Sequence, residues 1–301
     1  MAKGISIHVG VNTVRSSDFD VPTLRGCEND ATAMYRLARN RGFTGPDPIW
    51  SDDATFERVV PAILKAADEL EEGDIFLFTF AGHGGQMEDE DWDENLNVPG
   101  ADPHDETILL SDRMILDDFL GRGLWSRFAA GVRVLMVSDS CHSGTLFFAH
   151  EEVVASVRAA HGRVLGRRKR AVEIDDAVVT TGGPVMRKIS DAARRQHREK
   201  FSGFYEDLLS NLPSGDEAII KASVLLLAAC EDGEETADDY PHGVFTKALL
   251  EIWNDGSFTG NYEEFKTEIG NKLAGRPQTP MLTPVGQPNA EFRFEQRPFS
   301  I

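Results

Sequence analysis

Cysteine is scarce in this chain of 301 residues, which contains only Cys27, Cys141 and Cys230. So odd and sparse a set excludes the disulfide framework on which small secreted domains depend. The chain also lacks a run of about 18 apolar residues, the length that a membrane helix needs, and its start shows no cleavage-site pattern. We therefore expect a cytoplasmic protein with no membrane partner, in a reducing environment that keeps a reactive thiol free.

Basic residues are outnumbered, with 31 Lys and Arg against 50 Asp and Glu, and the formal net charge is −19. A chain this acidic is a poor general ligand for nucleic acid, so we expect no nucleic-acid partner. It could instead attract basic substrates into acidic clefts. The hydrophobic content of 41% is that of a globular protein, and the length allows one large domain or two ordinary ones.

Short apolar runs alternate with amphipathic helical patterns along most of the chain. This alternation is typical of a parallel sheet covered on both faces, so the predicted fold class is α/β, with a mostly parallel central sheet and helices on both faces. The predicted strands are residues 5–11, 74–80, 132–137, 223–229 and 291–294. The predicted helices are residues 29–41 (with Asn29 or Asp30 as the N-cap), 55–71, 244–253 and 262–273.

Two stretches depart from this alternation. Residues 86–106 are strongly acidic and irregular. Residues 158–200 contain 12 Lys and Arg against 5 Asp and Glu, a net charge of +7, and have weak periodicity. We interpret the second stretch as a mobile, exposed insertion.

A histidine and a cysteine each follow a predicted strand. His83 lies between glycines after the strand 74–80, and Cys141 lies in a turn of small polar residues after the strand 132–137. Because the carboxyl ends of neighbouring parallel strands meet at one edge of a sheet, the two loops should lie close together. A thiol needs a nearby base to become a nucleophile, and a leaving amine needs a proton donor. His83 could serve both needs, whereas the side chain of His142 should point away from that of Cys141.

Several short motifs together resemble those of the metacaspases and the related bacterial orthocaspases. Two of them, residues 82–85 (Gly-His-Gly-Gly) and 139–144 (Asp-Ser-Cys-His-Ser-Gly), hold the proposed pair. The others are residues 24–31, 229–233 and 278–280. The resemblance covers roughly residues 3–150 and 220–295, and the combination is specific although each motif alone is weak.

The resemblance implies a caspase-haemoglobinase fold and an endopeptidase that forms a thioester with its substrate. Residues 1–150 would form the large-subunit region, residues 221–301 the small-subunit region, and residues 151–220 a basic linker or activation loop within one composite domain. An oxyanion would be held by the backbone N–H groups of Gly84 and Cys141. The implied partners are protein substrates with accessible Arg or Lys.

The preference for Arg or Lys follows from acidic positions that match the family's first substrate pocket. Asp30 and Asp139 match such positions, Cys27 matches another, and Asp232 is a weaker candidate. Paired carboxylates can bind a guanidinium through two hydrogen bonds. The alternatives are that Asp30 only caps a helix and that Asp139 only orients its turn. Ala81 stands where many metacaspases have Ser, so one pocket hydrogen bond is missing.

No cofactor or metal is expected, although many metacaspases are activated by calcium. Residues 89–100 do not fit an EF-hand loop, because position six is Glu94 and position twelve is Gly100. The family's calcium site also uses an Asp shortly after the Cys-His-Ser-Gly motif, and this chain has Leu-Phe-Phe at residues 146–148. We therefore interpret the acidic loop as a solvated surface loop.

The basic stretch lies where caspase relatives are cut on activation. It could be cut by the enzyme itself, with Arg167, Arg168, Lys169 and Arg170 as candidate sites, or by an upstream activating protease. The alternative is a solvated linker. The alternative for the whole protein is a caspase-fold scaffold with an idle site, which the intact pair of His83 and Cys141 disfavours.

Overall fold

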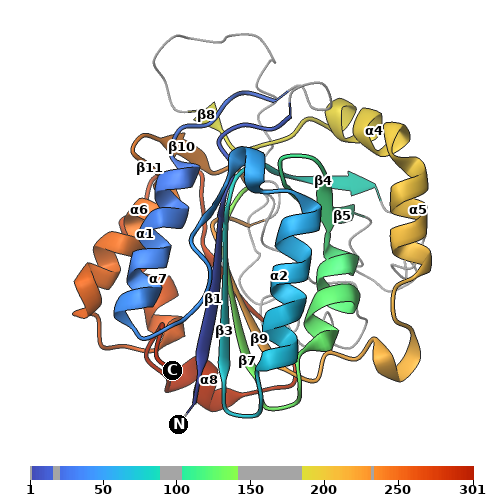
Figure 1. The fold of residues 1–301 in the computed structure, drawn as a ribbon. Helices are drawn as coiled ribbons and strands as arrows, with labels where there is room; N and C mark the ends of the chain where they lie inside the picture. Colours follow the sequence, from blue (N-terminus) through green and yellow to red (C-terminus); the bar gives the residue numbers. More distant parts are fainter. Residues whose placement is uncertain (1, 16–20, 89–103, 142–184, 232–233) are drawn as a thin grey trace, which may run out of the picture.

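Parallel strands form the centre of the molecule. The computed structural model describes residues 2–15, 21–88, 104–141, 185–231 and 234–301. Six strands form one sheet in the order β12-β9-β7-β3-β1-β2, in which only β12 is antiparallel to its neighbour. The apolar sequences of the inner strands explain this arrangement, since parallel strands are buried on both faces. Figure 1 shows the sheet edge-on, with helices on either side.

The strands of this sheet are β1 (Gly4–Gly10), β2 (Ile49–Trp50), β3 (Ile75–Ala81), β7 (Arg133–Asp139), β9 (Ser223–Ala228) and β12 (Met281–Gly286). Two small three-stranded sheets consist of β4 (Gly84–Glu88), β5 (His104–Leu109) and β6 (Met114–Leu116), and of β8 (Val185–Met186), β10 (Ala237–Asp239) and β11 (His242–Gly243). The helices are α1 (Cys27–Asn40), α2 (Phe56–Glu69), α4 (Asp191–Lys200), α5 (Ser202–Ser210), α6 (Val244–Trp253), α7 (Tyr262–Lys272) and α8 (Ala290–Phe294).

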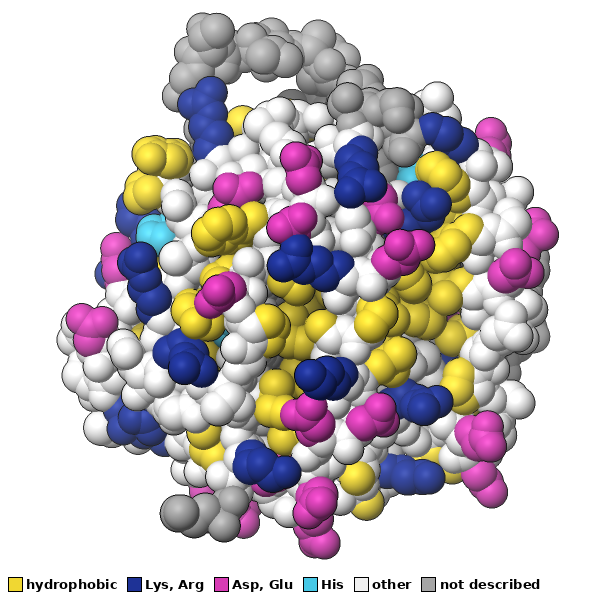
Figure 2. All heavy atoms as spheres, viewed as in Figure 1, with side chains coloured by type: hydrophobic (Ala, Val, Ile, Leu, Met, Phe, Trp, Pro, Cys, Tyr) yellow, Lys and Arg dark blue, Asp and Glu magenta, His cyan; other side chains and the backbone are white. Residues whose placement is uncertain are grey.

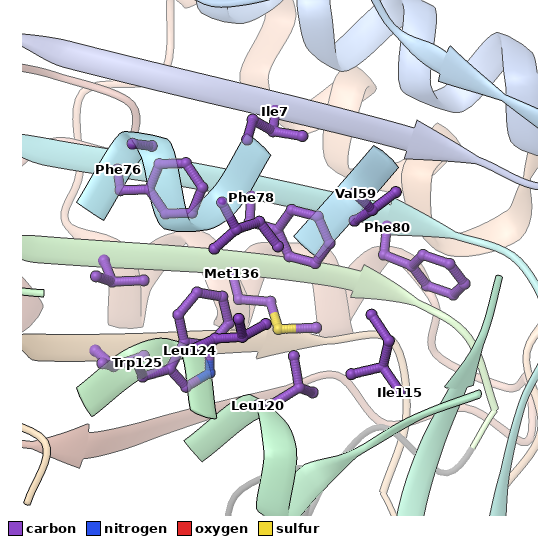
Figure 3. Close-up of a cluster of buried hydrophobic side chains, with 14 of the residues drawn as sticks. Ile7, Val59, Phe76, Phe78, Phe80, Ile115, Leu120, Leu124, Trp125 and Met136 are labelled. Carbon is purple, nitrogen blue, oxygen red and sulfur yellow. The ribbon is translucent and has the colours of Figure 1, made fainter. Parts of the chain in front are cut away.

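Alternate side chains of the central strands β3, β7 and β9 enter two separate cores. Phe76, Phe78 and Met136 pack with α2 and with the helical turns around Trp125 on one face of the sheet, as Figure 3 shows. The intervening residues, such as Leu77, pack against α1, α6 and α7 on the other face. This period of two is inherent in a strand, where successive side chains point to opposite faces. The predicted α/β class, with helices on both faces, is confirmed.

Because of the register between β3 and β7, the two loops that carry the sequence motifs start side by side. The strands pair in parallel, with Ala81 opposite Asp139, so the chain leaves both strands at one edge. β8 and β10 lie at this edge, at the upper end of Figure 1. The prediction that two neighbouring parallel strands bring these loops together is confirmed.

Two predictions about local structure are wrong. Residues 291–294 are not a strand but part of helix α8, because the side chain of Asn289 accepts a hydrogen bond from the N–H of Phe292 and starts a helical turn. The last strand is β12, which contains Pro284 and can do so because it lies at the edge of the sheet. Helix α1 begins at Cys27, so neither Asn29 nor Asp30 is its N-cap.

The interpretation of residues 158–200 as a mobile, exposed insertion is wrong for its last part. Residues 185–200 contain β8 and the whole of helix α4, and the side chains of Arg187, Ile189 and His197 are buried. Ser190 caps α4 by accepting a hydrogen bond from the N–H of Ala193. The basic composition concealed this order, because buried pairing of an arginine cannot be read from net charge. Residues 158–184 lie outside the described part of the chain.

The surface is mixed in charge despite the large negative total. Figure 2 shows acidic and basic side chains interspersed over the face that carries α1 and α2. Within the described residues, none of the helices is both long and apolar enough to cross a membrane.

Candidate active site

Two loops at the carboxyl edge of the sheet carry His83 and Cys141. His83 follows β3 and Cys141 follows β7, and both residues are buried, with exposures of 1% and 0%. In open α/β sheets, ligands bind at this edge of the strands. The structure therefore brings the histidine and the cysteine of the two motifs to the expected place.

The imidazole of His83 is oriented by one backbone carbonyl. Its Nε2 lies 2.8 Å from the oxygen of Pro22, and because a carbonyl can only accept, Nε2 carries the proton. Nδ1 is then unprotonated, and it has no hydrogen-bond partner among the described residues. Burial lowers the pKa of His83 to about 4, although the Pro22 carbonyl acts in the opposite direction. The ring is neutral at pH 7, and its free nitrogen can accept a proton.

The thiol of Cys141 faces the backbone of Thr236. Its Sγ accepts a hydrogen bond from the Thr236 N–H at 3.2 Å and lies 3.5 Å from the Thr236 carbonyl oxygen, to which it can donate. Burial raises the pKa of the Cys141 thiol, and the neighbouring Cys230 raises it further. The thiol is therefore protonated in this arrangement. To attack a carbonyl it must turn away from Thr236 and give its proton to a base.

A short extended segment, residues 185–189, lies across both loops, and we call it the strap. On one side, β8 pairs with β10, and the N–H of Arg187 donates to the carbonyl of Thr236 at 3.0 Å. On the other side, the N–H of Ile189 donates to the carbonyl of Gly84 at 3.0 Å. The strap thus lies between two backbone segments as an added strand.

Two backbone N–H groups converge on the carbonyl oxygen of Arg187. The backbone nitrogen of Gly84 lies 3.0 Å from this oxygen, and that of Cys141 lies 3.4 Å from it. These are the groups that the resemblance assigns to an oxyanion hole. A Cβ at position 84 would lie 2.5 Å from the carbonyl oxygen of Cys141, so only glycine lets the two backbone segments approach this closely.

The guanidinium of Arg187 is fully buried among three carboxylates, Asp30, Asp139 and Asp238, which we call the acid pocket. Nη2 lies 2.7 Å from Asp30 and 2.8 Å from Asp238. Nη1 lies 3.0 Å from the carboxylate of Asp139 and 3.0 Å from its backbone carbonyl. Burial alone would lower the pKa of Arg187. The neighbouring acidic groups, of which Asp139 has the largest effect, instead raise it well above its ordinary value.

Donors at the starts of two helices hold the acid pocket in place. Asp139 accepts hydrogen bonds from the N–H and the hydroxyl of Thr246, in the first turn of α6, at 3.0 and 2.7 Å. Asp238 accepts the N–H of Gly26, directly before α1, at 3.0 Å. Helix N-termini stabilise negative charge. Even so, burial raises the pKa of Asp139, while Arg187 and Thr246 lower it. The charge of the pocket therefore depends partly on a bound cation.

The third carboxylate, Asp30, is held by β11. It lies 2.9 Å from Nδ1 of His242 and accepts the N–H of Gly243 at 3.1 Å. Gly243 also sets the width of the pocket, because a Cβ there would lie 2.5 Å from both Nη2 of Arg187 and Oδ2 of Asp139. The pocket accommodates a guanidinium only because residue 243 is glycine.

An apolar cluster adjoins the acid pocket. Cys27 packs with Leu24 and Ala81, and Val185 of the strap packs against this cluster. Ala81, where many metacaspases have Ser, is thus part of an apolar surface under the strap. Charge interactions of Cys27 with Arg187 and the acid pocket indicate that it lies close to the bound guanidinium.

Most of the predicted site residues lie around the strap. Those brought together are Cys27, Asp30, His83, Gly84, Asp139 and Cys141. Those outside the described residues are Asp232 and the processing candidates Arg167, Arg168, Lys169 and Arg170.

The site residues that sequence reasoning missed include Pro22, Arg187, Thr236 and Asp238. Pro22, Thr236 and Asp238 show no signal outside their tertiary context, because their neighbours in space are far away in sequence. Arg187 offers one weak signal, an Arg-Lys pair that follows two apolar residues. Within the described ranges, no cluster of three or more His, Cys, Asp or Glu side chains is arranged to hold a metal ion.

The chain is similar to proteins of the caspase domain family. The model of the caspase domain family matches residues 8–299. Metacaspase-1 of Cryptococcus neoformans is 35% identical, over 92% of this chain and 62% of its own length. Metacaspase-1 of Schizosaccharomyces pombe is 27% identical, over 80% of this chain and 56% of its own length. The chain thus spans little more than half the length of these two relatives.

One solved structure matches over the whole chain. The crystal structure of the Geobacter sulfurreducens protein GSU0716 superposes with a TM-score of 0.75, at 32% identity, and covers 99% of both chains.

Proposed function

The chain belongs to the caspase domain family, and we propose that it is a cysteine endopeptidase that cleaves proteins after Arg, or after Lys, with Cys141 as the nucleophile and His83 as its acid/base partner. Membership in this family supports a caspase-like cysteine peptidase that acts on proteins.

A single observation carries the specificity: the acid pocket encloses the side chain of Arg187, whose carbonyl lies at the N–H groups of Gly84 and Cys141. The residue whose carbonyl is attacked is therefore also the residue whose side chain enters the pocket. A buried cluster of carboxylates is costly without a cationic partner. An Asp or Glu side chain would be repelled there, so cleavage after an acidic residue is excluded.

The pocket favours Arg over Lys. The guanidinium of Arg187 reaches the three carboxylates and the backbone carbonyl of Asp139 at once. A planar fork of five N–H donors matches this spread of acceptors, whereas an ammonium group is a compact charge with three donors. Lys should be accepted more weakly for this reason.

Apart from water, the chemistry requires only groups of this chain. Nδ1 of His83 takes the proton of the Cys141 thiol, and the sulfur attacks the carbonyl carbon of the residue in the pocket. The N–H groups of Gly84 and Cys141 stabilise the oxyanion, and these preorganised donors act on charge that develops in the transition state. The imidazolium then gives its proton to the leaving amine. Water hydrolyses the thioester, with His83 again as the base.

The same contacts support a zymogen. Arg187 fills the pocket and the strap buries Cys141, so a protein substrate cannot enter until the strap is released. Release could follow cleavage by the enzyme itself or by an upstream protease. Catalysis by a cysteine and a histidine in these roles needs no metal or cofactor.

The test compares fluorogenic peptides that end in Arg, Lys or Asp, with the purified chain and with chain nicked by trypsin that is then inhibited. We expect kcat/KM for Arg to exceed that for Lys, and no turnover of Asp. Cys141→Ala and His83→Ala should each abolish turnover.

The matched control for the pocket is Asp239→Asn, which changes an exposed carboxylate next to Asp238 and should leave the Arg rate unchanged. Absence of turnover in every preparation, intact or nicked, would contradict the proposal and favour an idle caspase-fold scaffold. Cleavage after Asp would contradict the assigned specificity.

A further inference from the structure

The strap is bound as a peptidase binds its substrate. An extended peptide that adds to an exposed strand edge is a common mode of peptide recognition, in which main-chain hydrogen bonds supply affinity and pockets supply specificity. Here, Val185 and Met186 pair antiparallel with β10, and the N–H of Arg187 extends this ladder to the carbonyl of Thr236. The pairing continues beyond Arg187, where Ile189 donates to Gly84.

The bond between Arg187 and Lys188 lies at the reactive groups. The Arg187 carbonyl oxygen accepts hydrogen bonds from the N–H groups of Gly84 and Cys141. The backbone of Lys188 also lies close enough to the ring of His83 to raise its pKa, so the proposed proton donor adjoins the residue that would leave. The carbonyl to be attacked, the N–H donors for its oxyanion and the proton donor His83 thus lie together at this bond, as its cleavage requires.

The two sides of this bond are held very differently. Arg187 is fully buried in the acid pocket. Lys188 is exposed, and within the described residues its ammonium makes one ion pair, with the partly exposed Glu235 at 3.1 Å, a type of pair that contributes little. Beyond it, Ile189 is buried and Ser190 caps α4. The leaving side is therefore anchored through its own helix and not through Lys188.

We propose that the peptide bond between Arg187 and Lys188 is the chain's own first substrate, cleaved in cis by Cys141, and that this cleavage uncovers the site. The inference rests on the proposed function, and it names the segment that the activity acts on first. Residues 167–170 are then not the primary site.

The step balances without any co-reactant except water. The Cys141 thiol turns from Thr236 and loses its proton to His83, and its sulfur forms a thioester with the Arg187 carbonyl carbon. The C–N bond to Lys188 breaks, and the nitrogen takes the proton from His83 and becomes a free amine. Water then hydrolyses the thioester, which restores the thiol and leaves a carboxylic acid at Arg187 that ionises.

Cleavage also weakens the hold of the strap. The residues up to Arg187 are then no longer joined through Lys188 to Ile189 and helix α4, which anchor the other side of the bond. Among the described residues, those before the cut are joined to β10 by two paired residues and by the N–H of Arg187. Exchange of the cut strap for a substrate should therefore be easier than displacement of the intact strap.

The test is mass spectrometry and N-terminal sequencing of four purified chains: wild type, Cys141→Ala, Arg187→Gln and Lys188→Pro. We expect the wild type to yield a fragment ending at Arg187 and a fragment beginning at Lys188, and the three variants to lack both. Arg195→Gln, which changes an exposed arginine of α4, is the matched control and should be cut like the wild type.

The two uncut variants at the strap should differ in activity. Lys188→Pro keeps Arg187 in the pocket, so it should stay covered. Arg187→Gln loses the buried charge pairing that holds the strap, so it should hydrolyse an Arg peptide at least about tenfold faster than Lys188→Pro without being cut. Equal rates in the two variants would overturn the idea that the strap covers the site.

Cleavage in cis is tested by dilution. Wild-type chain made by cell-free translation should be cut with the same half-time over a roughly hundredfold range of concentration, because intramolecular steps are independent of concentration. A half-time that lengthens in proportion to dilution would overturn cleavage in cis.

Failure of this inference is distinguishable from failure of the proposed function. Hydrolysis of an Arg peptide by a chain that is never cut between Arg187 and Lys188, or that is cut first within residues 167–170, would overturn the inference alone. Absence of both hydrolysis and cutting would overturn both.

Discussion

Asp238 joins the bound guanidinium to the start of helix α1. Its Oδ1 lies 2.8 Å from Nη2 of Arg187 and 3.0 Å from the N–H of Gly26. One carboxylate from the region after β9 thereby completes a pocket whose other two carboxylates, Asp30 and Asp139, come from before residue 150. The acid pocket thus depends on the packing of the two regions against each other.

Asp238→Asn should reduce kcat/KM for an Arg peptide by about 10- to 100-fold, because removing one member of a buried charge pairing costs about 1.4 to 3 kcal/mol in substrate binding. Most of the loss should appear in KM, since the carboxylate contacts the side chain and not the reacting carbonyl. Steady-state kinetics on strap-released enzyme measures this, with Asp239→Asn as the reference. An unchanged KM would show that Asp30 and Asp139 suffice.

Gly243→Ala should block the pocket. The added methyl group would lie 2.5 Å from the positions of both Nη2 of Arg187 and Oδ2 of Asp139, well inside van der Waals contact. We expect at least a hundredfold loss of Arg-peptide turnover, or about 2.7 kcal/mol or more. Gly203→Ala is the control, because a Cβ there has no neighbour within 4 Å. Full activity of Gly243→Ala would mean that substrate does not enter as Arg187 does.

Acid should destabilise the covered chain between pH 6.5 and about 4. The pKa of His83 is about 4 in the folded state because of burial, against about 6.5 when unfolded. The unfolded state therefore binds more protons in this window, and the free energy of unfolding falls as the pH falls, by up to about 1.4 kcal/mol per pH unit for this group. Above pH 6.5 the term is constant.

Urea unfolding of the uncut Cys141→Ala chain at pH 7 and pH 5 measures this loss. His8, whose pKa burial lowers to about 3, should contribute a loss of the same sign. Adding His83→Gln should remove part of the acid sensitivity, by about 2 kcal/mol between pH 7 and pH 5. The same acid sensitivity in both chains would mean that His83 is not the group that titrates.

The thiol of Cys141 should alkylate slowly while the strap is in place. It is fully buried and burial raises its pKa, and the thiolate is the reactive form. Iodoacetamide labelling at pH 7.5, localised by peptide mapping, should be at least about tenfold slower in Lys188→Pro than in Arg187→Gln. Equal labelling rates would contradict burial of the thiol by the strap.

A chelator should leave the activity unchanged. The proposed steps use proton transfer through His83 and backbone donors only, and the segment after Cys141 has no carboxylate at residues 146–148. Turnover of an Arg peptide should agree within about twofold between excess EGTA and 1 mM calcium, given the precision of such assays. Loss of turnover with EGTA that calcium restores would contradict this prediction.

The fold could be predicted closely where the apolar pattern was continuous. The strands predicted at residues 74–80 and 132–137 are β3 and β7, each shifted by one or two residues, and the helix at 244–253 matches α6. Prediction failed for β12, because Pro284 and Thr283 interrupt its apolar pattern. It failed for α8 because the alternation at residues 291–294 resembles a strand, whereas the cap that makes it a helix depends on Asn289.

The sequence by itself determined the α/β class, the meeting of the loops that carry His83 and Cys141, and the acidic character of Asp30 and Asp139. Each of these follows from local patterns: strand periodicity, a residue at a strand end, or a motif of adjacent residues. Only the tertiary structure decided that Asp238 completes the pocket, that Arg187 occupies it, and that Thr236 receives the thiol. The physical reason is that hydrogen bonding and charge pairing act over about 3 Å in space, and these partners lie tens to hundreds of positions apart in the chain.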